Sequence, residues 1–110
     1  MSTQRFADIL ARLSATIAAR KGADPASSYT AKLLAAGPVL AAKKLGEEAI
    51  ETALAAALND PDAIAAESAD LIYHWLVLLA ASDVSLDAVA AKLEAREGRS
   101  GIEEKASRKG

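Results

Sequence analysis

The sequence predicts an all-α fold, an antiparallel helical bundle of four to five helices that is completed by oligomerisation. Apolar residues recur at three- and four-residue spacing over most of the 110 residues, which is the period of helices buried along one face. No stretch shows the alternating pattern of a half-buried strand. Residues 61–81 are apolar on most sides, and a second subunit can supply neighbours for such a helix. We therefore expect a single all-α domain over residues 1–98 and a polar, mobile tail over residues 99–110.

The first two helices are placed by their start and stop signals. Apolar residues at helical spacing predict a first helix over residues 4–19, with Thr3 as its cap. Residues 20–27 contain glycine, aspartate and proline and are predicted to form a loop. Ser28 can then cap a short helix that ends near Gly37.

Three more helices follow. Pro38 suits the first turn of a third helix, expected over residues 38–58. Asp60 can cap a fourth helix over residues 61–81, because the Asn-Asp-Pro sequence before it stops the third. Ser85 can cap a last helix with an apolar stripe, which ends before the next glycine.

Composition excludes several function classes. The chain is 52% hydrophobic, and its net charge of −2 provides no basic surface for duplex nucleic acid. It contains no cysteine, which excludes disulfides, thiol catalysis and Cys-ligated zinc and fits a reducing compartment. Residues 1–13 alternate polar and apolar positions, unlike a signal peptide, and the longest strongly apolar run, residues 71–81, is about half of what a bilayer requires. We expect a cytoplasmic protein with no membrane partner.

Two acidic clusters on consecutive helices form the candidate site. Residues 47–51 are EEAIE and residues 67–70 are ESAD. Carboxylates three residues apart lie within ~60° around a helix and ~4.5 Å along its axis, so they share a face. Antiparallel packing would bring four acids together, and each pair ~6 Å apart would repel by roughly 3 kcal/mol at an effective dielectric near 20. The pattern predicts a divalent-cation site, and oxygen-only ligands favour Mg²⁺, with Mn²⁺ as the alternative.

Acidic runs on alanine-rich helices are usually solvated surface without a binding function, which is the alternative to a metal site. Glu47 and Glu51 lie inside or beside the apolar stripe of their helix, and no matching set of basic residues within the same helices neutralises the acids. These two facts favour a functional site. A single histidine among carboxylates is more often a core residue, so His74 is left out of the ligands. Tyr73 and Trp75 are interpreted as packing residues.

Three segments carry a resemblance to a known family. Residues 44–51 (KLGEEAIE), 67–74 (ESADLIYH) and 28–33 (SYTAKL) resemble the phosphoribosyl-ATP pyrophosphohydrolases of histidine biosynthesis. That family belongs to the all-α, MazG-like nucleoside triphosphate pyrophosphohydrolases, whose shared pattern is EExxE, a gap, then ExxD. The resemblance covers nearly the whole chain. It points to the free-standing form, because the chain lacks the room and the cysteines for the cyclohydrolase domain to which some relatives are fused.

The resemblance implies an activity and a set of site residues. The activity is hydrolysis of 1-(5-phosphoribosyl)-ATP to 1-(5-phosphoribosyl)-AMP and pyrophosphate, the second step of L-histidine biosynthesis. Carboxylate-held Mg²⁺ suits this reaction, because it can neutralise the leaving pyrophosphate and activate water. Glu47 would be either an outer ligand or the base that orients the attacking water. The implied metal ligands are Glu48, Glu51, Glu67 and Asp70, and Glu47, Glu48 and Glu51 form the catalytic group.

The substrate is expected to contact residues outside the acidic clusters. Lys44, one turn before Glu48, and Lys32 and Tyr29 on the short helix are the candidates; each lysine could instead be a surface charge or an ion-pair partner. The basic end of the chain is a further hypothesis, since it could close over the phosphates of the substrate. Its members are Arg96, Arg99, Lys105, Arg108 and Lys109.

Two other functions remain open. A house-cleaning pyrophosphohydrolase for nucleotides such as dUTP or dCTP would use the same acids, although the segment around Tyr29 argues against it. A non-catalytic helical oligomerisation module would use the acids to bind structural metal or to solvate a groove. In each case the expected assembly is a homodimer or a higher homo-oligomer.

Overall fold

A computed structural model describes residues 3–97, and this part of the chain contains five α-helices and no strand. The all-α prediction is therefore confirmed. The expected tail over residues 99–110, which includes most of the basic end, lies outside the described residues. The helices are α1 (Thr3–Ala19), α2 (Tyr29–Ala36), α3 (Pro38–Ala57), α4 (Pro61–Ala81) and α5 (Leu86–Arg96).

The helices begin where the capping residues predict. The side chain of Ser28 accepts a hydrogen bond from the N–H of Ala31 at 3.1 Å. Asp60 and Ser85 accept equivalent bonds, of 3.1 and 3.0 Å, at the starts of α4 and α5. Each satisfies a backbone donor that the first helical turn leaves free. The expected cap at Thr3 is wrong, because Thr3 is itself the first residue of α1.

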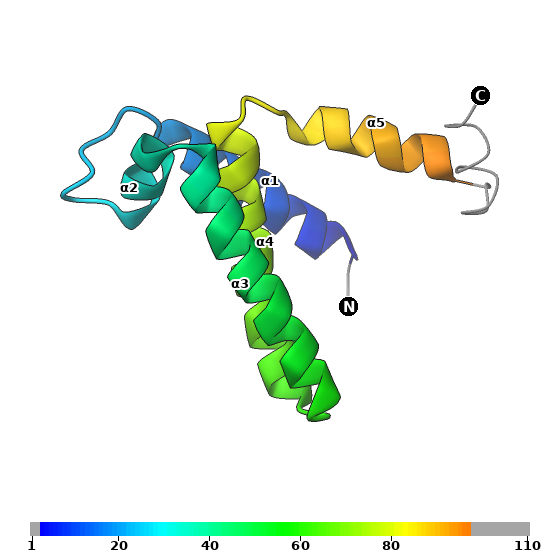
Figure 1. The fold of residues 1–110 in the computed structure, drawn as a ribbon. Coiled ribbons are helices and arrows are strands. Elements are labelled where there is room, and N and C mark those ends of the chain that lie inside the picture. Colours follow the sequence, from blue (N-terminus) through cyan, green and yellow to red (C-terminus); the bar gives the residue numbers. More distant parts are fainter. Residues whose placement is uncertain (1–2, 98–110) are drawn as a thin grey trace, which may run out of the picture.

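A long antiparallel pair, α3 and α4, organises the molecule (Figure 1). At one end of this pair, α1 crosses α4 and the short α2 packs against both helices of the pair, and the buried core lies there. The other end of the pair projects from this junction, and α5 extends away from it without burying a single residue. The fully buried core residues are Ile17, Leu33, Ala41, Leu76 and Val77.

The sequence was misleading about the apolar face of α3. The apolar stripe expected along this helix includes Ile50, Leu54 and Leu58. These side chains do not face inward, since they are 64%, 59% and 80% exposed. The buried residues of α3 are instead Ala41 and Ala55. Small side chains let α3 approach α4 closely, so the larger ones are left on the outer surface. The pair therefore carries an uncovered apolar line, with one residue every helical turn.

By length and composition alone, α4 could cross a membrane. Its middle carries Glu67 and Asp70, which meet a carboxylate of α3. Carboxylates at the centre of a bilayer cost several kcal/mol. We therefore interpret α4 as a helix that packs on α3, and not as a membrane-spanning segment.

Gly37 joins α2 to α3 through a backbone conformation that other residues avoid. Its φ and ψ are 91° and 178°, a region that is essentially restricted to glycine. Gly37 also donates its N–H to the carbonyl of Leu34 at 3.2 Å, which closes the last turn of α2. The angle between α2 and α3 thus depends on one glycine.

Replacing Gly37 with alanine should destabilise the fold by about 1–3 kcal/mol. An added Cβ would meet no atom within 4 Å, so the cost lies in the backbone rather than in a clash. Gly46→Ala is the matched control: it also meets open space but lies inside α3, where alanine should stabilise by up to about 1 kcal/mol. Urea denaturation measures both changes, and equal midpoints for the two variants would contradict the argument.

Candidate active site

Three carboxylates from α3 and α4 meet between the two helices. Glu48, Glu67 and Asp70 each offer an oxygen, and these atoms lie within 4.8 Å of one another. The side chain of Glu48 is 17% exposed, Glu67 is half-buried, and Asp70 is exposed. The antiparallel packing expected from the sequence therefore does bring the two acidic clusters together, in a site that is open on one side.

Glu51 is tied to the same group. The pKa of its carboxyl group is raised above its ordinary value, first by a hydrogen bond with Glu67 and then by the negative charge of Glu67. A hydrogen bond with Glu48 acts in the opposite direction. All four acids expected to bind metal thus lie within one interacting cluster, and their mutual repulsion is what a divalent cation would relieve.

Two carboxylate oxygens in the cluster lack the partners that buried polar atoms require. Glu48 Oε2 and Glu67 Oε2 are buried and form no hydrogen bond within the described part of the chain. A buried carboxylate oxygen without a partner is costly. A hard cation with oxygen ligands would satisfy both atoms, so the donor set fits Mg²⁺ or Mn²⁺.

Glu47 and Lys44 lie at the edge of this cluster. Glu47 is half exposed, and its carboxylate lies 3.9 Å from the ammonium group of Lys44, one turn earlier. It is not among the three acids that converge, although its charge adds to the raised pKa of Glu51. The ion-pair alternative for Lys44 is thus observed in the structure, and the pair leaves both groups accessible to a ligand.

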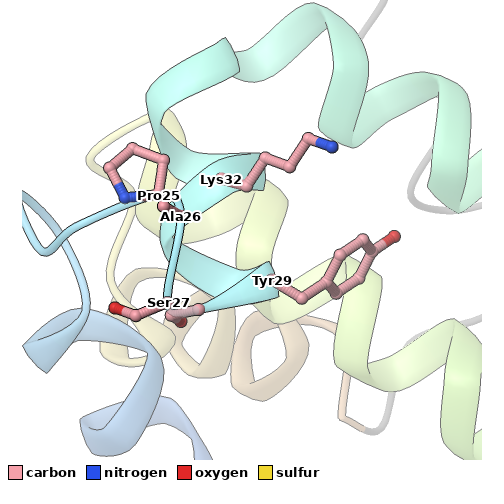
Figure 2. Close-up of a pocket in the computed structure, with 6 residues that line it drawn as sticks. Pro25, Ala26, Ser27, Tyr29 and Lys32 are labelled. Atoms are coloured by element: carbon pink, nitrogen blue, oxygen red, sulfur yellow. The ribbon is translucent and has the colours of Figure 1, made fainter.

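Tyr29 and Lys32 line a separate, open hollow of about 630 Å³ beside α2. Figure 2 shows both side chains extending from the same helix, with Pro25, Ala26 and Ser27 on the preceding loop. Within residues 3–97, Lys32 forms no ion pair with an acidic group. The hollow therefore presents a free ammonium group next to an aromatic ring.

Aromatic side chains connect this hollow to the acids. The rings of Tyr29 and His74 are 6.4 Å apart and nearly perpendicular, and His74 Nδ1 lies 4.0 Å from Glu48 Oε1. His74 is 7% exposed, as expected of a core residue.

The contact of Tyr73 with α2 was not predicted from the sequence, because Tyr73 was interpreted as a packing residue. Its hydroxyl group lies 2.6 Å from the hydroxyl of Thr30, and no local pattern connects two residues so far apart.

Comparison with known proteins places the chain in a family. The family model described as phosphoribosyl-ATP pyrophosphohydrolase matches residues 10–97, which include both acidic clusters and the hollow beside α2. A protein of Caulobacter vibrioides named phosphoribosyl-ATP pyrophosphatase is 72% identical over 106 residues, covering 96% of this chain and 98% of the relative. Proteins of the same name from Dinoroseobacter shibae and Parvibaculum lavamentivorans are each 62% identical, over 91% and 90% of this chain and 98% and 91% of the respective relative. With its carboxylates gathered as the sequence motif predicts, the chain belongs to the phosphoribosyl-ATP pyrophosphohydrolase family.

Proposed function

We propose that the protein hydrolyses 1-(5-phosphoribosyl)-ATP to 1-(5-phosphoribosyl)-AMP and pyrophosphate, the second step of L-histidine biosynthesis. The observation that carries the proposal is the cluster of carboxylates between α3 and α4 in a chain of this family. The absence of cysteine fits a reducing compartment, and we place the activity in the cytoplasm.

Glu48, Glu51, Glu67 and Asp70 are the proposed ligands of the metal, which we expect to be Mg²⁺. The convergence of Glu48, Glu67 and Asp70, and the two unpartnered buried oxygens, support the assignment of these three acids. Glu51 is included because its pKa is raised by Glu67. When bound, the ion supplies charge neutralisation for the leaving pyrophosphate and lowers the pKa of a bound water.

The remaining site residues are assigned by their position. Glu47 lies at the edge of the cluster, where its accessible carboxylate can accept a proton from the attacking water or bind the metal indirectly. Lys44 and Lys32 can bind phosphate oxygens through their ammonium groups. Tyr29 is 53% exposed, and its ring offers a flat apolar surface for the substrate.

The deciding experiment is pyrophosphate release by the purified protein with Mg²⁺. Phosphoribosyl-ATP is offered beside ATP, dUTP and dCTP, with a chelator as control. Chelator-sensitive turnover of phosphoribosyl-ATP far above the others is expected. A preference for dUTP or dCTP would indicate a house-cleaning enzyme instead, and no release from any of them would support the non-catalytic module.

We also propose that the protein is a homodimer or a higher homo-oligomer. The line formed by Ile50 and Leu54 on α3 and by Leu58 directly after it exposes three large apolar side chains. A second copy would remove this line from water, at roughly 25 cal/mol for each Å² of apolar surface. The line lies on the helix that carries Glu48 and Glu51, so a partner bound there would lie near the metal site.

Leu54→Glu is expected to convert the oligomer to a monomer, because a carboxylate would be buried without a partner at the centre of the line. Sedimentation velocity measures the change directly. Leu54→Met keeps the volume and apolar character of the side chain, so it should leave the oligomer intact. A wild-type protein that sediments as a monomer would contradict the proposal.

A further inference from the structure

The hydroxyl groups of Thr30 on α2 and Tyr73 on α4 form a hydrogen bond. We propose that these two hydroxyl groups form a positioning pair, which holds the substrate-binding side of α2 in register with the metal-binding helix α4. The oxygens are 2.6 Å apart and join residues 43 positions apart in the chain. Within residues 3–97, this is the one side-chain hydrogen bond between α2 and α4. The inference rests on the proposed function, since it concerns how the same substrate is bound.

The short helix α2 needs such a contact. It has eight residues, and helices of this length are marginal without tertiary packing. Ala31 and Leu33 bury its inner side, but the hydrophobic effect itself has no preferred direction. A hydrogen bond at 2.6 Å is directional, so it fixes where α2 sits along α4.

Neighbouring residues of α2 carry different tasks. Thr30 is half-buried and its hydroxyl group bonds to α4, whereas Tyr29 and Lys32 are exposed and line the hollow. A shift of α2 along α4 would therefore move both proposed substrate contacts together (Figure 2). The pair does not line the hollow itself, which is why we assign it to positioning rather than to catalysis.

On the α4 side, Tyr73 is packed against a residue that is itself fixed. The rings of Tyr73 and His74 are 4.9 Å apart, in an edge-to-face arrangement. His74 Nδ1 donates a hydrogen bond to the carbonyl of Asp70 at 2.9 Å, because a carbonyl can only accept. The ring of His74 thus has a set orientation next to Glu48, and Tyr73 gives α2 a fixed reference to the acids.

The experiment compares Tyr73→Phe, Thr30→Val and the double variant, using phosphoribosyl-ATP hydrolysis. Each single change should raise KM about three- to tenfold, with kcat within about twofold and an unchanged Mg²⁺ midpoint. Since both changes remove the same bond, the double variant should be no worse than either single one. Thr30→Ser keeps the hydroxyl group and should restore the wild-type KM. Thr16→Val is the control, because it removes a hydroxyl that bonds only to the carbonyl of Arg12 within α1.

Amide hydrogen exchange gives a second readout that does not depend on the substrate. Residues 29–36 should exchange faster in both single variants and at the wild-type rate in Thr30→Ser. Unchanged exchange and KM in Tyr73→Phe, or additive effects in the double variant, would overturn the pairing. A wild-type protein that hydrolyses only dUTP or dCTP would overturn the proposed function instead, and faster exchange of α2 in the single variants would then still support the pair.

Discussion

Replacing Glu51 with glutamine is expected to lower kcat/KM for phosphoribosyl-ATP by about a hundredfold or more, while raising the melting temperature of the metal-free protein. The loss of activity follows because one carboxylate ligand of the proposed metal is removed, and each 1.36 kcal/mol of lost transition-state stabilisation costs about a factor of ten. The gain in stability follows because glutamine removes a negative charge that lies close to the carboxylate of Glu67. The two effects are opposite in sign, which separates a functional role from a structural one.

The sign of the stability effect comes from the raised pKa of Glu51. This pKa lies above its ordinary value because of the hydrogen bond with Glu67 and the charge of Glu67. A carboxyl group whose pKa is higher in the folded state than in the unfolded state destabilises the fold when ionised. That penalty is fully present above the folded-state pKa and disappears as the pH falls through it. Glutamine carries no charge, so it removes the penalty at neutral pH.

Thermal melts with and without chelator, beside initial rates, test both effects. Mg²⁺ should raise the melting temperature of the wild-type protein more than that of Glu51→Gln, because a ligand that binds only the folded state stabilises it. Glu94→Gln is the control, since Glu94 is an exposed acid on α5, away from the cluster. Unchanged turnover in Glu51→Gln would remove Glu51 from the site. An unfolded or dissociated variant would favour the structural module.

Leu33→Ala is expected to lower the free energy of unfolding by about 2–5 kcal/mol, the largest stability change expected from the variants considered. Leu33 is 1% exposed and lies in the core where α2 meets α1, α3 and α4. Truncation of Leu33 leaves a cavity beneath α2, which is too short to be stable without tertiary contacts. The helix should therefore also become more mobile. The KM for phosphoribosyl-ATP should therefore rise as well.

Urea denaturation measures the stability of this variant. Leu93→Ala is the matched control, because Leu93 is 63% exposed on α5 and its truncation should change the free energy of unfolding by less than about 0.5 kcal/mol. Equal losses for the two variants would show that α2 does not depend on Leu33.

Local chemistry explains which parts of the fold could be predicted. The starts of α2, α4 and α5 follow from single side chains, Ser28, Asp60 and Ser85, which bond to backbone groups three residues away. Such local contacts can be predicted from the sequence alone. The prediction that Thr3 caps α1 was wrong, because Thr3 is the first residue of that helix.

Contacts between helices were harder to predict. The outward direction of Leu54 depends on which side of α3 packs most closely on α4, and alanine residues determine this. Within the site, spacing predicted the convergence of Glu48, Glu67 and Asp70, because acids three apart share a face. The bond between the hydroxyls of Thr30 and Tyr73 carries no periodic signal, so the structure was needed to find it.

The arrangement of α3 and α4 also has a kinetic meaning. The proposed metal ligands all lie on two consecutive helices, and residues 58–60 are the whole connection between them. Closing so short a loop costs little chain entropy, and topologies built from contacts close in sequence fold fastest. The carboxylate pocket can therefore form as soon as this helical hairpin closes, before α1 docks. Assembly of the chemical centre during folding thus requires only contacts that are close in the sequence.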